Sequence, residues 1–311
     1  MTTEETLKNR IFTLIDEKKQ SMMAWDDHLD FVSNIIKDLN SFIDDEKCFT
    51  ESEIEEMLKN LVQYRVVLDI PIPKNTLLLR AVKIGDGYNY PNNTKVSRLS
   101  YIPRDELFEA KLGRCNKAKQ SIYYACLANS IKDVNVPFSE RGVKEKEHIN
   151  ILISKTSKEL NLRFIGLYDY YKRGTVPPFE VHDFFEEVHQ YYIDTHDETL
   201  LSAIELCDSF FCDIFRRKGH CKLYQVTSVL SDLFMLDRGV DGLIYPSVET
   251  EGSPNIAIKP NSVDSKILHQ EVRIFFIQRV YGYSKYYAIN FNTVGKIHDK
   301  ENIWWSDTLI V

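Results

Sequence analysis

The sequence lacks the segments that direct a protein into or across a membrane. It contains no run of about 18 uncharged apolar residues, which a membrane-spanning helix requires. The residues that follow Met1 are Thr and Glu, without the basic and apolar segments of a secretory signal. We therefore expect a cytoplasmic protein with no membrane partner.

Cysteine pairs of the CxxC type are also missing. A chain of 311 residues is long enough to bury a core without disulfides, so we expect reduced thiols. His220 and Cys221 do not combine with the earlier cysteines at any common zinc spacing, and we expect no metal site. The six cysteines are Cys48, Cys115, Cys126, Cys207, Cys212 and Cys221.

A basic domain, typical of nucleic-acid-binding proteins, is absent too. The net charge is −7, and residues 1–60 alone carry 15 acidic and 7 basic side chains. Residues 74–119 reverse this balance with 10 basic and 4 acidic side chains. A local positive stretch in an acidic chain favours a small anionic ligand over a nucleic-acid backbone.

The N-terminal region has neither Gly nor Pro over its first sixty residues, which favours helices. Apolar residues recur there with helical spacing. Thr50 followed by Glu53 has the pattern of a capping box and predicts a helix start. We expect residues 1–66 to form a helical region.

Short apolar segments then alternate with helical periodicity, without a regular βαβ order and without internal repeats. This mixture predicts an α+β fold. We expect a central domain at 67–262 and a C-terminal β extension at 263–311 that packs on the core. The extension includes a predicted hairpin that turns at 282–285. The other strands are predicted at 66–68, 77–79, 121–125, 149–154, 162–167, 243–245 and 256–258, and helices at 181–193, 197–217 and 225–236.

Three motifs follow one another in the central domain. The first is Arg80, which closes an apolar strand. The second is GRCN at 113–116, followed by IYYA at 122–125. The third is DGLIYPS at 241–247, followed by NIAI at 255–258. Their order and spacing are more specific than any one of them.

Together these motifs resemble those of the RES family, which is named for an arginine, a glutamate and a serine. The resemblance covers roughly residues 75–262. The second motif is similar to the family's GGRWN stretch and the third to its DGxxYPS element. Two positions depart from the pattern: Cys115 stands in place of the tryptophan and Leu112 in place of the first glycine.

The resemblance assigns the three residues of the family name. Arg80 matches the arginine and Ser247 matches the serine. Glu140 is our choice for the glutamate, because it keeps the family's distance to the strand near residue 149. Asp133, Glu145 and Glu147 are the alternatives.

The resemblance implies a fold similar to that of ADP-ribosyltransferases and an activity that degrades NAD. Family members are mostly bacterial toxins paired with an antitoxin. We therefore expect an enzyme that cleaves the nicotinamide–ribose bond, as an NAD phosphorylase or a glycohydrolase. NAD would be the substrate, inorganic phosphate a possible co-substrate, and no prosthetic group is expected.

These residue types suit that reaction. Cleavage of the N-glycosidic bond builds positive charge on the ribose, and a carboxylate stabilises that charge. An arginine fork binds phosphate oxygens, and a tyrosine ring can stack on nicotinamide. Arg98 and Arg104 are further candidates for binding the pyrophosphate. The residues expected to bind NAD are Arg114, Asn116, Tyr123, Tyr124, Tyr245 and Asn255.

A second interpretation keeps the fold without the chemistry. The domain would then bind NAD, ADP-ribose or a protein partner. A carboxylate close to both Arg80 and Ser247 would favour the enzyme, whereas a binding module would tolerate the loss of Glu140.

Overall fold

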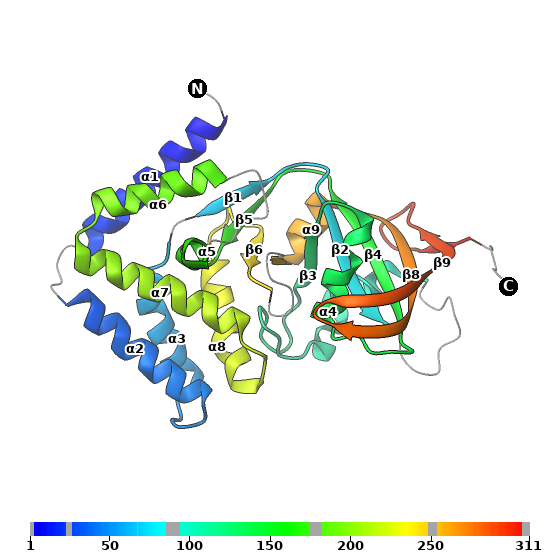
Figure 1. The fold of residues 1–311 in the computed structure, drawn as a ribbon, viewed down its shortest axis with the longest axis horizontal. Coiled ribbons are helices and arrows are strands. Elements are labelled where there is room, and N and C mark those ends of the chain that lie inside the picture. The colour runs from blue at the N-terminus through cyan, green and yellow to red at the C-terminus, as the bar shows by residue number, and fades with distance from the viewer. Residues whose placement is uncertain are drawn as a thin grey trace. The chain divides into compact units, whose positions relative to one another are not determined.

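The computed structural model describes residues 3–22, 27–66, 68–84, 94–173, 182–247 and 254–306, and it divides the chain into two compact units. The first unit comprises Met1–Ile70, Leu112–Lys117 and Arg163–Val240, and the second comprises Pro71–Lys111, Ala118–Leu162 and Asp241–Val311. Figure 1 shows the elements along the chain. The first unit is mainly helical, and the second is mainly a sheet with short helices.

Helices form most of the first unit. Helix α2 packs against α7, and α3 packs against α8. The predicted capping box at the start of α3 is confirmed: the Thr50 side chain accepts from the Glu53 N–H, and Glu53 accepts from the Thr50 N–H. The helices of this unit are α1 (Thr3–Met22), α2 (His28–Ile43), α3 (Glu51–Val62), α5 (Leu167–Arg173), α6 (His182–Thr195), α7 (Glu198–Arg216) and α8 (Cys221–Phe234).

The strands join in one sheet of ten among the described residues, in the order β1-β5-β6-β7-β3-β2-β4-β8-β9-β10. Strands β1 and β5 span the points where the chain passes from one unit to the other. The strands are β1 (Asp69–Ile72), β2 (Leu77–Lys83), β3 (Tyr123–Ala128), β4 (His148–Thr156), β5 (Leu160–Phe164), β6 (Gly242–Tyr245), β7 (Asn255–Ile258), β8 (Ile267–Gly282), β9 (Lys285–Lys296) and β10 (Trp304–Trp305).

Short helices complete the second unit. They are α4 (Asn135–Glu140) and α9 (Pro260–Lys266), with 3₁₀ turns at η1 (Val96–Arg98), η2 (Arg104–Glu109) and η3 (Ile131–Val134). With helices and a mixed set of strands in one chain, the α+β class predicted from the sequence is confirmed.

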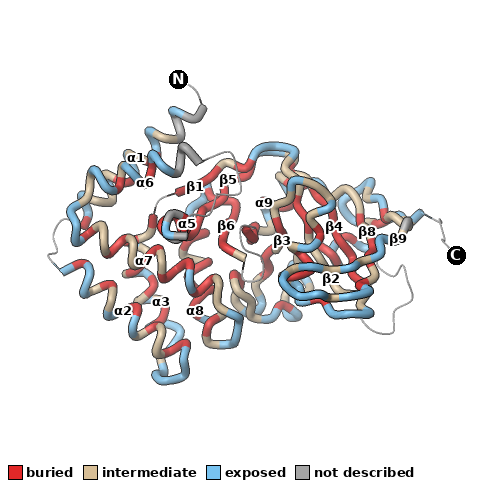
Figure 2. The backbone as a smooth tube through the Cα atoms, viewed as in Figure 1, coloured by how far each residue is buried: buried red, intermediate tan, exposed pale blue. Residues whose placement is uncertain are grey.

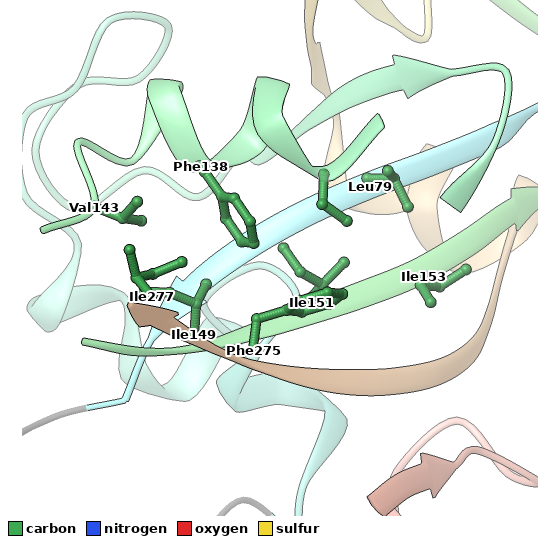
Figure 3. Packing of buried hydrophobic residues seen from close by; sticks show 9 residues of the cluster. Leu79, Phe138, Val143, Ile149, Ile151, Ile153, Phe275 and Ile277 are labelled. Atoms are coloured by element: carbon green, nitrogen blue, oxygen red, sulfur yellow. The ribbon is translucent and has the colours of Figure 1, made fainter. Parts of the chain in front are cut away.

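Helix α4 covers one face of the sheet, here called the α4 face. Phe138 points from α4 onto the strands, as Figure 3 shows. It packs in an apolar cluster with Leu79 of β2, Ile151 of β4 and Phe275 of β8. Burial of each such side chain contributes about 1.5–3 kcal/mol, so the cluster holds α4 firmly on the sheet.

Strands β4, β5, β6 and β7 are buried along their whole length or nearly so. Figure 2 shows this for β4 and β6, whose residues are almost all buried. A strand with buried side chains on both faces has other parts of the protein packed against both faces. The face of the sheet opposite α4 is therefore also covered, and we call it the opposite face.

The predicted C-terminal extension is part of this same sheet. β8 pairs through its residues 267–276 with the whole of β4, and β9 pairs with β8. The predicted hairpin turn is present: Gly282 pairs with Lys285, and Tyr283 and Ser284 have φ values of 49° and 58°. Positive φ at both central residues matches the twist of the flanking strands.

The two compact units differ from the three consecutive segments predicted as 1–66, 67–262 and 263–311. Residues 163–240, expected in the central domain, belong to the helical unit together with 1–70. Strand boundaries also differ. Ser121 and Ile122, predicted in a strand, lie before β3. Val66 and Leu68 lie outside β1, and residue 67 is not among the described residues. The strand predicted at 162–167 ends at Phe164.

Candidate functional site

The α4 face brings together two of the three residues matched to the family name. The hydroxyl of Ser247 donates a hydrogen bond to the Glu140 carboxylate, although the two residues are 107 positions apart. Both side chains are partly exposed. Because both side chains are partly exposed, the Glu140 carboxylate can contact a ligand while it accepts the hydrogen bond from Ser247.

Glu140 and Ser247 are held by neighbouring elements of the sheet unit. Glu140 is the last residue of α4, which the Phe138 cluster anchors. Ser247 follows β6 by two residues, so it keeps the side of the sheet that Tyr245 faces. The local sequence therefore places each residue at the end of a well-packed element.

A lateral row across the strands identifies the residues that share this face. Tyr245 of β6 pairs with Asn255 of β7, Asn255 pairs with Cys126 of β3, and Cys126 pairs with Leu79 of β2. Directly paired residues point to the same side of a sheet. Since Leu79 belongs to the cluster under α4, the whole row lies on the α4 face.

Cys126 connects the row to the carboxylate. Burial, together with the negative charge of Glu140, raises the pKa of the Cys126 thiol well above its ordinary value. Its Sγ donates to the Asn255 side-chain oxygen at 3.3 Å. Cys126 is therefore a neutral thiol that fixes Asn255 on the face where Glu140 lies.

The three alternative acids each have a backbone partner. Asp133 accepts from the N–H groups of Asn129 and Ser130 at 2.8 and 2.9 Å. Glu145 accepts from the Val280 N–H at 3.1 Å. Glu147 accepts from the Lys144 N–H at 2.7 Å and from the Lys83 ammonium at 2.9 Å. Among the four candidates, Glu140 is the one that contacts Ser247.

The two tyrosines of β3 point to opposite sides of the sheet. Tyr124 alternates with Tyr123 and has the same orientation as Cys126, so it lies on the α4 face. It is partly exposed, whereas Tyr123 is fully buried on the opposite face. Tyr124 is thus the tyrosine of this pair that shares a face with Glu140.

Arg80 lies on the opposite face, next to Leu79 in the strand. Its Nε donates to the Leu99 carbonyl at 2.9 Å and its Nη1 to the Tyr124 carbonyl at 2.7 Å. The guanidinium also lies 5.6 Å from the centre of the Tyr123 ring. Among the described residues these are its hydrogen bonds and its ring contact, and none of them is with Glu140 or Ser247.

Arg114 and Asn116 belong to the helical unit. The Arg114 guanidinium donates to the carbonyls of Ile214, Phe215 and Arg217 at 3.2, 2.8 and 2.9 Å. These carbonyls lie at the C-terminal end of α7, where a cation satisfies the last backbone acceptors. Asn116 is buried, and its amide donates to the Lys117 carbonyl at 2.9 Å.

Of the assisting arginines, Arg98 lies 3.4 Å from the Glu106 carboxylate and Arg104 lies 3.4 Å from the Asn261 side chain. Both contacts are at the surface of the sheet unit, where an ion pair contributes little to stability.

The opposite face holds a polar network that the motifs did not indicate. The ring of His269 has its Nδ1 at 2.7 Å from the Ser154 hydroxyl and its Nε2 at 3.0 Å from the Ser100 hydroxyl. Ser154 lies 3.4 Å from the Tyr123 hydroxyl. These four residues are scattered in the sequence, so only the pairing of β3, β4 and β8 could reveal the network.

A search of the described residues finds no group of three or more His, Cys, Asp or Glu side chains arranged to hold a metal ion. Within the same residues, no helix combines the length and apolar character needed to cross a membrane. Comparisons of the chain with family models, curated proteins and solved structures gave no match.

Proposed function

We propose that this protein cleaves the nicotinamide–ribose bond of NAD, as an NAD glycohydrolase or phosphorylase with an ADP-ribosyltransferase-like core. The observation that carries the proposal is the hydrogen bond from Ser247 to Glu140. The resemblance matches Ser247 to the third motif and gives Glu140 as the choice among four acids, and the fold joins the two residues across 107 positions of the chain.

Glu140 is the catalytic carboxylate of this proposal. Departure of neutral nicotinamide leaves an oxocarbenium-like ribose, and a nearby carboxylate stabilises that cation more than it stabilises the neutral ground state. No strong general acid is needed, because the leaving group is already a good one. Ser247 holds the carboxylate in place and offers its oxygen to a ribose hydroxyl or to the attacking phosphate.

In this proposal Tyr124 contacts the substrate, and Asn255 supports the site. Tyr124 shares the α4 face and offers a partly exposed ring for stacking on nicotinamide. Asn255 is fixed by Cys126 and supports the strand beside Ser247. Arg80 acts as a positioning residue, because its bond to the Tyr124 carbonyl fixes the strand that presents Tyr124.

The direct test is to incubate the purified full chain with NAD, with and without inorganic phosphate, and to separate the products. Nicotinamide with ADP-ribose identifies a hydrolase. Nicotinamide with ADP-ribose-1″-phosphate, formed only when phosphate is present, identifies a phosphorylase. Absence of nicotinamide under both conditions contradicts the proposal.

A second candidate function is a module that binds NAD, ADP-ribose or a protein partner such as an antitoxin. It is favoured by the two arginines, because backbone carbonyls engage the guanidinium groups of both Arg80 and Arg114. Calorimetric binding of ADP-ribose without nicotinamide release would select this function over the enzyme.

A further inference from the structure

A pocket of about 370 Å³ lies within the sheet unit, away from Glu140 and Ser247. Its walls come from the segment at 96–103, from α9 and the start of β8, and from 297–300. Most of the wall is apolar, and its aliphatic side chains include Val96, Val263, Ile267, Leu268 and Ile297. This volume is at the lower end of the range for small-molecule sites.

The pocket has a polar end formed by Ser100 and His269. The His269 ring is held from both sides by the Ser154 and Ser100 hydroxyls, at 2.7 and 3.0 Å. Because hydroxyls hold both ring nitrogens, the ring has a fixed orientation. The Ser100 hydroxyl, with two lone pairs and one proton, can exchange hydrogen bonds with one polar group of a ligand.

The charges around the pocket favour an uncharged ligand. Burial, assisted by the positive charge of Arg80, lowers the pKa of His269 to about 4, so the ring is neutral at pH 7. The charged side chains of the lining already have partners. The Asp264 carboxylate accepts from the Tyr101 hydroxyl at 2.5 Å, and its backbone carbonyl accepts from Lys300 at 2.7 Å. The Asp299 carboxylate accepts from the N–H groups of Glu301 and Asn302 at 2.8 and 2.6 Å. The residues that line the pocket, all described, include no arginine fork for a phosphate or carboxylate.

The pocket is separate from the proposed NAD site. Ser154 and Tyr123, which extend the His269 network, face the opposite side of the sheet from α4. None of the lining residues was selected by the RES-like motifs. The residues assigned to the proposed NAD site are therefore not among those that line this pocket.

We propose that this pocket binds a small uncharged ring compound that carries a single hydroxyl or carbonyl group. The ring lies between the aliphatic walls, and its polar group exchanges a hydrogen bond with Ser100 beside His269. Apolar area supplies the affinity, and the polar group sets the orientation.

The test compares two probes of one ring size by calorimetry at pH 7: 2-naphthol, which is uncharged, and 2-naphthoate, which is an anion. We expect 2-naphthol to bind to the full chain. The affinity for 2-naphthoate should be at least about tenfold weaker. Failure of 2-naphthol to bind, or equal binding of the two probes, overturns the proposal.

Two variants locate the binding. Leu268 lines the pocket and is 52% exposed, so Leu268→Asp is tolerated by the fold and places a charge in the wall. We expect Leu268→Asp to weaken the binding of 2-naphthol about tenfold. The control is Leu236→Asp, at a leucine that is 71% exposed and lies in the helical unit. Equal affinities in the two variants would place the probe elsewhere and contradict the assignment.

A second measurement does not depend on Leu268. The ring proton signals of His269, identified by their loss in His269→Gln, should shift on addition of 2-naphthol. Unchanged His269 signals at a saturating probe concentration would contradict the assignment. Ser97 lines the pocket and is exposed, so a bulky side chain there should obstruct the pocket. Ser97→Trp should therefore abolish both the shift of the His269 signals and the binding of 2-naphthol.

Discussion

The two faces of the central strands differ in what they bury. The α4 face buries an apolar cluster around Phe138 and leaves Glu140 and Ser247 partly exposed at its margin. The opposite face holds Arg80 and the network of Tyr123, Ser154 and His269; Tyr123 and Ser154 are buried, and Arg80 and His269 are partly buried. One face fixes a short helix by packing, and the other fixes polar groups by hydrogen bonds.

This difference shows how alternation along a strand separates two roles. Adjacent residues Leu79 and Arg80 of β2, and Tyr123 and Tyr124 of β3, point to opposite sides of the sheet. Consecutive residues of a sequence motif in a strand therefore lie on both faces of the sheet. The candidate chemistry belongs to one face, and the support for its backbone belongs to the other.

The largest effect should come from the apolar face. Phe138→Ala should lower the free energy of unfolding by about 3–5 kcal/mol, because it opens a cavity beneath α4. Urea unfolding measures this change. The control is Phe108→Ala, at a phenylalanine that is 72% exposed and should change stability by less than about 0.5 kcal/mol. A small effect at Phe138 would mean that α4 is not held by this cluster.

Arg80→Ala should have the next largest effect, about 3 kcal/mol, because two carbonyls on the opposite face lose a charged donor. Thermal unfolding and nicotinamide release should both be measured. Arg98→Ala, which removes a surface ion pair, is the matched control, with a loss below about 1 kcal/mol. An Arg80→Ala protein with unchanged stability and full activity would contradict both roles.

The sequence predicted local features best. The capping box of α3 and the hairpin at 282–285 depend on residues a few positions apart, and both were confirmed. The strand predicted at 162–167 was too long because a distant residue decides its end. Asp208 of α7 accepts from the N–H groups of Gly166 and Tyr168, which begins α5 there.

The candidate site was predictable only in part, for the same reason. The third motif selected Ser247, and the spacing to the strand near residue 149 favoured Glu140 among four acids; the fold joins these two residues. They also selected Arg114, whose guanidinium completes the C-terminal end of α7 in the helical unit. His269 carried no local signal, since its partners Ser100 and Ser154 come from distant segments.

His269 should make the opposite face sensitive to acid. The pKa of His269 is lowered from 6.5 to about 4 by burial and by Arg80, so the unfolded chain binds a proton that the folded chain excludes. Stability is therefore complete above pH 6.5 and falls as the pH decreases toward 4, by about 2–3 kcal/mol. His269→Gln should reduce this dependence in urea unfolding between pH 7 and 4.5. An unchanged slope would show that His269 is not the group responsible.

Asn150 should have the smallest effect and the opposite sign. It is 1% exposed on the opposite face, and neither polar atom of its amide has a hydrogen-bond partner within the part of the chain that the structure describes. Asn150→Val removes a buried unsatisfied amide, and it should raise the free energy of unfolding by about 1 kcal/mol. A loss of stability would instead reveal a partner that Asn150 requires.

The measurement that tests the central claim most directly is kcat/KM for nicotinamide release from NAD by the full chain, by Glu140→Gln and by Glu145→Gln. Glu145 accepts from a backbone N–H and has no bond to Ser247, so it is the matched control. We predict that Glu140→Gln lowers kcat/KM by at least about a hundredfold and that Glu145→Gln leaves it within about twofold. Equal activity of the Glu140→Gln and wild-type proteins would contradict the assignment of catalysis to the α4 face.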